Sequence, residues 1–311
     1  MSLGVGIVGY GSAGRQHADA LDGLPEAHVA AVFDQDAATG TGEHARARSW
    51  AELLADPRVG LVSLCVPPGG RAALAVQALE AGKAVLLEKP PAVSPAEIDL
   101  VAEAARRAGR PVGVMLQHRM RLPDSVLAAN WSDPAVTAVL EVSRFRPPAH
   151  YRRAGWRSDP ASALGGILAH LGVHYLDLAC QIMGSPRRLT IAPVREFAPS
   201  IDMRVTGHIV FTSGSTLAFT VTAESSVRSE RLQILGPEGG FCIADGMVTL
   251  QLGGTEHTLP TVPTPELRRR VYQEMAQAVA TGRQPVRCHL EAARPVTEIL
   301  AGAAADARAV A

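Results

Sequence analysis

The chain has 311 residues, which is enough to bury a large core and to form two domains. It carries 30 basic and 30 acidic residues, and its formal net charge is zero. This balance gives no electrostatic footprint for nucleic acid or for an anionic membrane, so we expect neither as a partner. The four cysteines, Cys65, Cys180, Cys242 and Cys288, lie far apart without a CxxC pair. That spacing favours reduced thiols in a cytoplasmic protein over a disulfide framework or a zinc site.

Neither a membrane span nor a signal peptide is expected. The most apolar window covers residues 164–183, but it contains His170, His174 and Asp177, which argues against a span. The apolar stretch at the start of the chain has no basic segment before it and runs straight into glycines. It therefore predicts a first strand and not a cleaved leader. We expect a soluble protein of the cytoplasm.

The first 120 residues alternate short apolar runs with helical patterns. Repeated β-α units of this length imply a parallel sheet covered by helices on both faces, so we predict a Rossmann domain over residues 1–120. The expected strands cover residues 5–8, 28–33, 61–66, 85–87 and 111–116, and the expected helices cover residues 12–21, 50–54 and 71–81 together with one that begins at the capping box Ser94-Pro95-Ala96-Glu97.

The remainder, residues 121–311, has a different pattern. Strands with period-two alternation, such as residues 216–222, place large apolar side chains on one face and predict an open, mostly antiparallel sheet. The fold class is therefore α/β, a Rossmann domain followed by an α+β domain. Further elements are expected at residues 136–145 (a long strand) and at residues 162–183, 265–280 and 290–310 (helices).

A glycine fingerprint, Gly9-Tyr10-Gly11-Ser12-Ala13-Gly14, joins the first strand to the first helix. Gly9 permits the tight turn, Gly11 lets the backbone approach a pyrophosphate, and Gly14 lets helix and strand pack closely. The helix N-terminus favours the pyrophosphate anion. Asp34 follows the second strand and would accept hydrogen bonds from both ribose hydroxyls. Because no Arg or Lys stands among the next residues, 35–37, NAD is preferred over NADP. The alternative is a glycine-rich turn of another α/β fold, with Asp34 as a surface charge.

A lysine follows the expected strand that ends at Leu87, in the triplet Glu88-Lys89-Pro90. Ligands of open parallel sheets bind outside the carboxyl ends of the strands, which is where this turn is placed. A lysine beside a cationic nicotinamide could have a lowered pKa and could contact a substrate hydroxyl. Taken alone, such a turn is more often an ordinary solvated loop.

Two histidines, His170 and His174, stand four residues apart on one face of the expected helix, with Asp177 three residues further on. Three interpretations are open: histidines satisfied within a helix face, a zinc pair, or acid-base catalysis of hydride transfer. No HExxH glutamate accompanies the pair, so no metal is expected. The independent indications of Lys89 and a nicotinamide site favour catalysis.

Together these segments resemble the Gfo/Idh/MocA oxidoreductase family over nearly the whole chain. The resemblance rests on residues 9–14, Asp34, Cys65-Val66-Pro67-Pro68, Glu88-Lys89-Pro90 and the Gly-x-His of the later helix. It implies that Lys89 and His174 serve the substrate hydroxyl, with His174 as the general base. It also implies cofactor contacts at Val66, Pro67, Glu88 and Lys89, and a homodimer or homotetramer formed through the open sheet.

Two departures from the family pattern stand out. Many members carry an aspartate where this chain has His170, so His170 must substitute by hydrogen bonding or the substrate differs. Gly69-Gly70-Arg71 stands where relatives often have Asn and, a few residues on, His.

Arg157 could meet a carboxylate or phosphate of the substrate, or it is a surface arginine. The other residues expected to shape the substrate site are Gln117, Arg119, Tyr151 and Trp156.

The leading hypothesis is an NAD-dependent oxidoreductase that transfers hydride between the cofactor and a secondary hydroxyl or ketone of a sugar, cyclitol or nucleotide sugar. His174 would take the hydroxyl proton and Lys89 would stabilise the developing oxyanion. The rival is a non-catalytic dinucleotide-binding regulatory protein of the same fold, and a third possibility is an enzyme that alternates between two sugars on a tightly held cofactor. The retained Lys89 and His174 favour an enzyme.

Overall fold

The computed structural model describes residues 2–152, 155–192, 194–198 and 201–309, apart from the side chains of residues 157, 158, 160, 161 and 306–309. The chain forms two compact units, each built from two segments. The first unit comprises Met1–Met120 and Thr264–Ala293, and the second comprises Arg121–Pro263 and Arg294–Ala311. The predicted division into residues 1–120 and 121–311 thus differs from the observed one at residues 264–293, which return to the first unit.

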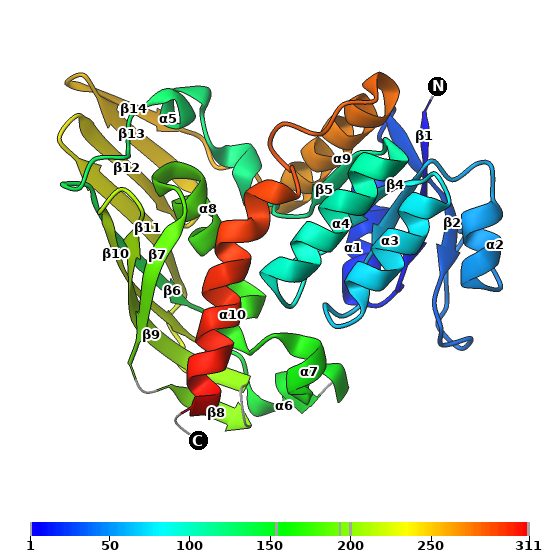
Figure 1. Ribbon diagram of the computed structural model, residues 1–311, viewed down its shortest axis with the longest axis horizontal. Coiled ribbons are helices and arrows are strands. Elements are labelled where there is room, and N and C mark those ends of the chain that lie inside the picture. The colour runs from blue at the N-terminus through cyan, green and yellow to red at the C-terminus, as the bar shows by residue number, and fades with distance from the viewer. Residues whose placement is uncertain (1, 153–154, 193, 199–200, 310–311) are drawn as a thin grey trace. The chain divides into compact units, whose positions relative to one another are not determined.

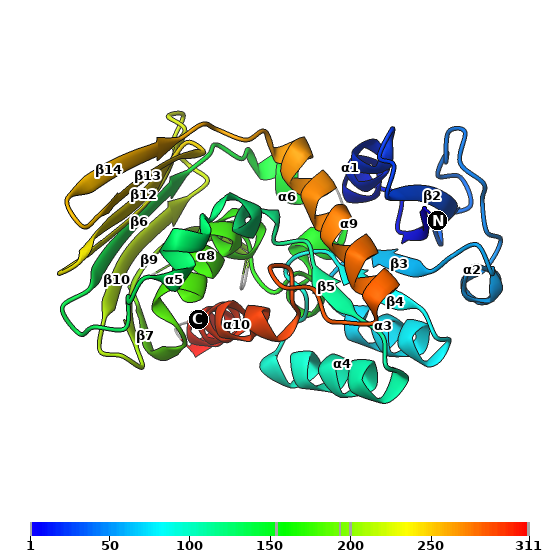
Figure 2. The same ribbon diagram turned by 90° about the horizontal axis from the view of Figure 1, so that it is seen from above.

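The first unit is a five-stranded parallel sheet in the order β2-β1-β3-β4-β5 (Figures 1 and 2). The predicted Rossmann sheet is confirmed. Its strands are short and buried, as expected for a sheet covered on both faces. They are β1 (Leu3–Val8), β2 (Ala27–Phe33), β3 (Leu61–Leu64), β4 (Ala84–Leu87) and β5 (Val112–Val114).

The helix predicted to begin at the capping box of residues 94–97 does so. The Ser94 hydroxyl accepts a hydrogen bond from the Glu97 N–H at 3.3 Å, Pro95 opens the helix, and Gly109 ends it in the left-handed conformation. The helices of the first unit are α1 (Ser12–Leu21), α2 (Trp50–Ala55), α3 (Arg71–Glu80), α4 (Pro95–Ala108), η1 (Gln117–Arg121), α9 (Thr264–Thr281) and η4 (Glu291–Ala293).

Helix α9 belongs to the first unit because its apolar face is buried there. Val271, Tyr272 and Met275 are fully buried in one hydrophobic cluster with Ile7 and Leu21. Pattern alone predicted the helix, but the partner of its apolar face lies some 250 residues earlier in the chain, at a separation where sequence periodicity carries no information.

The second unit is a nine-stranded sheet in the order β14-β13-β12-β11-β6-β10-β9-β7, with β8 paired to β9 (Figure 1). Every pairing among the described residues is antiparallel except that of β6 with β10. The predicted open, mostly antiparallel sheet is confirmed. Its strands are β6 (Thr137–Ser143), β7 (Pro186–Ile191), β8 (Arg195–Ala198), β9 (Ile201–Phe211), β10 (Thr216–Thr222), β11 (Ser229–Gly236), β12 (Gly239–Ala244), β13 (Met247–Leu252) and β14 (Thr255–Leu259).

The single helix predicted over residues 162–183 is wrong, because the chain breaks at Leu164 and Gly165, whose φ angles are 55° and 105°. The predicted helix over residues 290–310 is likewise divided, into η4 and α10. The helical segments of the second unit are α5 (Asp124–Ala128), α6 (Pro148–Arg152), η2 (Gly155–Ser158), α7 (Pro160–Ala163), the π-helix η3 (Leu168–Gly172), α8 (Val173–Met183) and α10 (Arg294–Ala309).

Asp202 fixes the restart of the chain after this break. Its carboxylate accepts hydrogen bonds from the N–H groups of Gly166 (2.6 Å) and Leu168 (2.8 Å), which lie at the start of the π-helix. A Cβ on Gly166 would lie 2.0 Å from the Asp202 carbonyl oxygen, so only glycine allows this approach. The position of the His170 turn is therefore set by an aspartate on β9.

Candidate active site

The glycine fingerprint has the geometry that its three glycines predict. A Cβ on Gly14 would lie 2.1 Å from the Gly9 carbonyl oxygen, so α1 packs against the turn more closely than any other residue allows. Gly9 has a φ angle of 84°, in the left-handed region. A Cβ on Gly11 would meet nothing within 4 Å, which leaves the backbone open beside the N-terminus of α1. This open backbone fits the approach of a pyrophosphate.

Asp34 stands directly after β2, beside the fingerprint. Its Oδ2 accepts a hydrogen bond from the Tyr10 N–H at 2.6 Å, and its Oδ1 accepts one from the Asp36 N–H at 2.9 Å. The carboxylate is thereby held in a fixed orientation. Carboxylate lone pairs outnumber these two bonds, so the group retains capacity to accept ribose hydroxyls.

A basic side chain does lie near Asp34: Arg46, beyond residues 35–37, returns to this edge of the sheet through a single bridge to Val32. Its guanidinium donates to the carbonyl oxygens of Asp34 (3.2 Å), Asp36 (2.9 Å) and Thr39 (2.6 Å). These bonds commit Arg46 to shaping the loop after Asp34. No periodic pattern in the sequence signals such a return of the chain.

The Lys89 turn lies at the carboxyl end of β4, as predicted. The Glu88 N–H donates to the Leu64 carbonyl at 3.1 Å, which continues the pairing with β3, and the next peptide bond but one, Lys89–Pro90, is cis. The Glu88 side chain folds back, and its Oε2 accepts a hydrogen bond from the Lys89 N–H at 2.9 Å. Lys89 itself is half-buried. The turn is thus tied to its own glutamate and is not an ordinary solvated loop.

Glu88 belongs to a buried polar network that the sequence interpretation did not find. Its Oε1 lies 3.0 Å from Nε2 of His17, on α1. The Nδ1 of His17 is 2.7 Å from the Tyr272 hydroxyl and 2.9 Å from the Ser63 hydroxyl. Helices α1 and α9, strand β3 and the turn after β4 therefore meet at one histidine. Two features could have signalled it: His17 stands three residues after Gly14, and it falls on the apolar face of α1.

The network is charged. Burial raises the pKa of Glu88, but the hydrogen bond and charge of His17, helped by the charges of Lys89 and Arg71, outweigh it and hold this pKa at about 2. Burial lowers the pKa of His17, but Cys65, Tyr272 and Glu88 together raise it well above its ordinary value. At neutral pH the pair is therefore a carboxylate and an imidazolium.

Arg71 links the ends of β3 and β4. The side chain is only 2 % exposed, and its guanidinium donates to the carbonyl oxygens of Val66, Glu88 and Pro90. Burial lowers its pKa to about 10, so it stays charged at neutral pH. The departure from the family pattern at residues 69–71 thus supplies a cation that ties the Val66-Pro67 loop to the Lys89 turn.

Gln117 and Arg119, both predicted to bind substrate, lie in η1 after β5 and are buried. The Arg119 guanidinium donates to the carbonyl oxygens of Arg287 and His289, each at 3.1 Å, which favours a structural role. The Gln117 Oε1 is buried and accepts no hydrogen bond from the described residues. Gln117 therefore keeps an acceptor that a ligand hydroxyl or amide could satisfy.

In the second unit, His170 lies in a turn of π-helix, a conformation that recurs at functional sites. It stands in a ring cluster, with its centroid 6.4 Å from that of Tyr151, 5.9 Å from Trp156 and 6.2 Å from His150. His174 is the second residue of α8 and is buried. The structure therefore brings the predicted residues Tyr151, Trp156 and His170 together, while the side chain of Arg157, in η2, lies outside the described residues.

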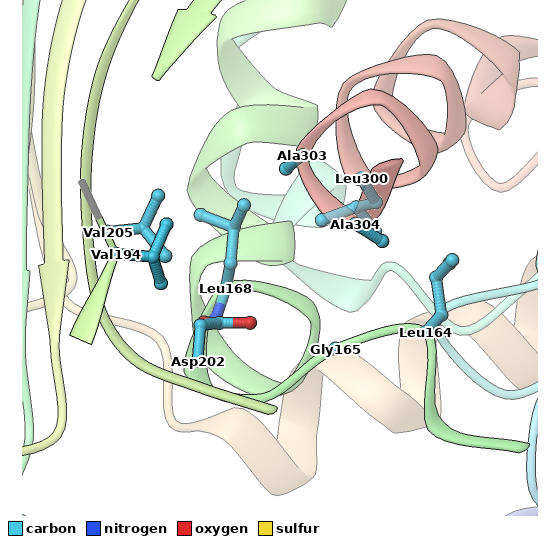
Figure 3. Close-up of a pocket in the computed structure, with 9 residues that line it drawn as sticks. All are labelled: Leu164, Gly165, Leu168, Val194, Asp202, Val205, Leu300, Ala303 and Ala304. Carbon is cyan, nitrogen blue, oxygen red and sulfur yellow. The ribbon is translucent and has the colours of Figure 1, made fainter. Parts of the chain in front are cut away.

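A cavity beside this segment is too small for a substrate. Figure 3 shows its lining, in which apolar side chains from α10 and β9 face Leu168 and the carboxylate of Asp202. Its volume of about 10 Å³ leaves room for about one water. The lining residues are Leu164, Gly165, Leu168, Val194, Asp202, Val205, Leu300, Ala303 and Ala304.

Neither a metal centre nor a membrane helix is found in the part of the chain that the structure describes. No group of three or more His, Cys, Asp or Glu side chains there could hold a metal ion, and no helix there is long and apolar enough to cross a bilayer. All four cysteines are free thiols.

The family is shown by two matches. Residues 3–116 match the model of the "Oxidoreductase family, NAD-binding Rossmann fold", and residues 134–242 match the "GFO/IDH/MocA C-terminal domain". The chain therefore belongs to the GFO/IDH/MocA oxidoreductase family.

Similar proteins include dehydrogenases of different substrates. The chain is 26 % identical over 215 residues to scyllo-inositol 2-dehydrogenase (NADP(+)) IolW of Bacillus subtilis, covering 65 % of this chain and 58 % of the relative. Levoglucosan dehydrogenase, solved with NADH and levoglucosan, superposes with a TM-score of 0.84 at 17 % identity over 100 % of this chain and 98 % of the other. UDP-N-acetylglucosamine 3-dehydrogenase GnnA from Acidithiobacillus ferrooxidans gives 0.80 at 20 %, over 99 % and 97 %.

Proposed function

We propose that this protein is an NAD-dependent oxidoreductase that acts on a secondary hydroxyl, or the corresponding ketone, of a sugar, cyclitol or nucleotide sugar. The observation that carries the proposal is the fixed Lys89 turn at the carboxyl end of β4, in the same sheet whose first strand ends in the open glycine fingerprint. The ligands of such sheets bind at these strand ends.

The chain's own residues supply binding and proton chemistry. His174 accepts the proton of the substrate hydroxyl, and Lys89 stabilises the oxygen as negative charge develops on it. The substrate contacts are made by His170, Trp156, Gln117 and Arg157. Arg119 has a structural role instead. When bound, the nicotinamide supplies the hydride acceptor or donor.

The cofactor is held by the fingerprint residues 9–14, by Asp34, and by the loops that carry Val66, Pro67, Glu88 and Lys89. A 2′-phosphate beside Asp34 would face a carboxylate, and Arg46 is engaged by three carbonyl groups. NAD is therefore the proposed cofactor. The retained Lys89 and His174, together with named relatives that include several dehydrogenases, favour an enzyme over a regulatory dinucleotide-binding protein.

The outer face of the nine-stranded sheet is the proposed contact between copies of the chain. Val139, Leu235 and Met247 lie on this face and are 57 %, 48 % and 47 % exposed. Apolar side chains gathered on one sheet face mark an interaction surface. A homodimer or homotetramer in the cytoplasm is proposed, and light scattering of the purified protein measures its mass.

The test of the function is NADH appearance at alkaline pH on a panel of polyols, free sugars and UDP-sugars, with NADP run in parallel. Turnover of a panel member with NAD supports the proposal. A protein that binds NAD but turns over no member in either direction would overturn it in favour of the regulatory alternative.

A further inference from the structure

A second buried carboxylate, Glu230 on β11, lies at the centre of a cluster of arginines in the second unit. The residue is 4 % exposed. Its Oε1 is ion-paired with Arg144 and lies 3.4 Å from Nε of Arg228. Its Oε2 accepts a hydrogen bond from the Tyr175 hydroxyl at 2.9 Å. One carboxylate thus already serves two guanidinium groups and a hydroxyl.

Two further arginines lie within the electrostatic field of the same carboxylate. Arg146 stands two residues after Arg144, and burial together with the charge of Arg144 lowers its pKa. Arg121 lies within the field of Glu230 and Tyr175, and burial lowers its pKa also. Two guanidinium groups are therefore paired with Glu230, and two more lie within its field. Crowding like charges in a partly buried region is unfavourable unless an anion compensates them.

The bonding of these guanidinium groups is also incomplete. The Nε atoms of Arg144 and Arg121 are buried and have no hydrogen-bond partner among the described residues. A buried donor left without an acceptor costs free energy, so an acceptor from outside the chain would stabilise the cluster.

The cluster is exposed to solvent at Arg228, and Arg146 relates it to the ring cluster around His170. Arg228 has a side chain that is 64 % exposed. Arg146 lies within the field of the Tyr151 hydroxyl, and the ring of Tyr151 is stacked on that of His170 with the centroids 6.4 Å apart. Arg146 therefore lies near the rings assigned to the substrate.

We propose that Arg144, Arg146 and Arg228, the arginine cluster, bind an anionic group of the substrate, so that the preferred substrate is a sugar acid or a nucleotide-linked sugar. The fork of a guanidinium matches both a carboxylate and a phosphate, and the shared chemistry is a planar or tetrahedral oxyanion. This inference rests on the proposed function, because it names the substrate class of the same site.

The first test is equilibrium binding by calorimetry to the whole protein at low salt. The probes are glucuronate for the carboxylate, UDP for the diphosphate, and glucose as the neutral comparison. The variants are R146M and R228M, which spare the buried pair of Arg144 with Glu230. The matched control is R187M, which removes an exposed arginine on β7 of the same unit.

We expect at least one anion to bind more tightly than glucose, and its affinity to fall roughly tenfold in R146M and R228M but not in R187M. Which anion responds distinguishes the sugar acid from the nucleotide sugar. R228K should recover part of the affinity, because it returns the charge without the fork. Equal binding of anions by wild type and both cluster variants, or no anion binding at low salt, would overturn the inference.

Turnover separates this inference from the function on which it rests. If neutral sugars are oxidised with the same kcat/KM as anionic ones and the cluster variants leave KM unchanged, the anion site is wrong and the oxidoreductase stands. If anion binding depends on the cluster but no panel member yields NADH, the anion site stands and the proposed chemistry fails.

Discussion

Two buried glutamates, Glu88 in the first unit and Glu230 in the second, are surrounded differently. One carboxylate oxygen of Glu88 is hydrogen-bonded to His17, and the other accepts a hydrogen bond from the N–H of Lys89. The charges that act on Glu88 are those of His17, Lys89 and Arg71. Each of these cations or donors also has protein partners. Glu230, in contrast, is ion-paired with Arg144 and Arg228 and lies within the field of Arg121 and Arg146. The Nε atoms of Arg144 and Arg121 are buried and have no acceptor among the described residues.

The comparison separates two uses of a buried charge. A network that closes on itself fixes geometry, because each member holds the next in one orientation. A network that carries surplus charge and unmet donors is stabilised by a ligand of the opposite charge. By this criterion the Glu88 network positions Lys89, and the Glu230 cluster binds substrate.

Removing the lysine that the Glu88 network positions should have the largest effect. We expect K89M to lower kcat/KM by roughly 100- to 10,000-fold, the range of general acid-base and charge stabilisation, with NAD affinity retained. Steady-state kinetics and NAD titration measure the two quantities. The control is K83M, at the other lysine of the chain, which donates only to the carbonyls of Asp56 and Val59.

K83M should lose stability but keep its kcat once the folded fraction is taken into account. A K89M protein that retains wild-type turnover on a confirmed substrate would show that the network holds a turn with no role in the chemistry.

Lowering the pH should remove the stability that the Glu88 carboxylate contributes to the fold. The pKa of Glu88 lies near 2 in the folded protein, below its ordinary value, so its contribution to stability is present above about pH 4.5 and is lost as pH falls towards 2. The contribution is on the order of 3 kcal/mol. His17 has the opposite sign: its raised pKa contributes stability below about pH 6.5 that is lost as pH rises through the folded value.

Urea unfolding of wild type and E88Q at several pH values measures this contribution. The free energy of unfolding of wild type should fall more steeply than that of E88Q between about pH 4.5 and 2.5. Parallel curves would mean that Glu88 is not held as a carboxylate by His17.

A smaller effect is expected from Arg71, which contacts the Lys89 turn only through carbonyl groups. We expect R71M to lower kcat roughly tenfold, because the turn is less well aimed, and to leave KM for NAD within a few-fold. R71K should recover part of the rate. The control is R58M, at an exposed surface arginine whose pair with Asp56 contributes little. If R71M loses stability without any change in kcat of the folded protein, Arg71 is structural only.

The sequence was sufficient for features that depend on neighbours in the chain. The fingerprint, Asp34 and the Lys89 turn each follow a strand, so the local order of strand, turn and helix placed all three. The helix cap at Ser94 was predicted for the same reason. These features need no knowledge of which distant segments meet.

Features that depend on long-range pairing were not predictable. His17 and Tyr272 are 255 residues apart, and Arg144 and Glu230 are 86 apart. The break at Leu164 was hidden because apolar residues continue through it, and the restart depends on Asp202 of β9. Arg119 has the kind of side chain that binds substrates, but its guanidinium donates to the carbonyl of a residue 168 positions away.

The most direct test examines the Lys89 turn and the arginine cluster in one assay. NADH appearance is measured for wild type, K89M and R228M on uronic acids, UDP-sugars and matched neutral sugars. The account predicts turnover of an anionic substrate that K89M abolishes through kcat and R228M weakens through KM. Bound NAD with no turnover of any panel member, in either direction, would contradict it.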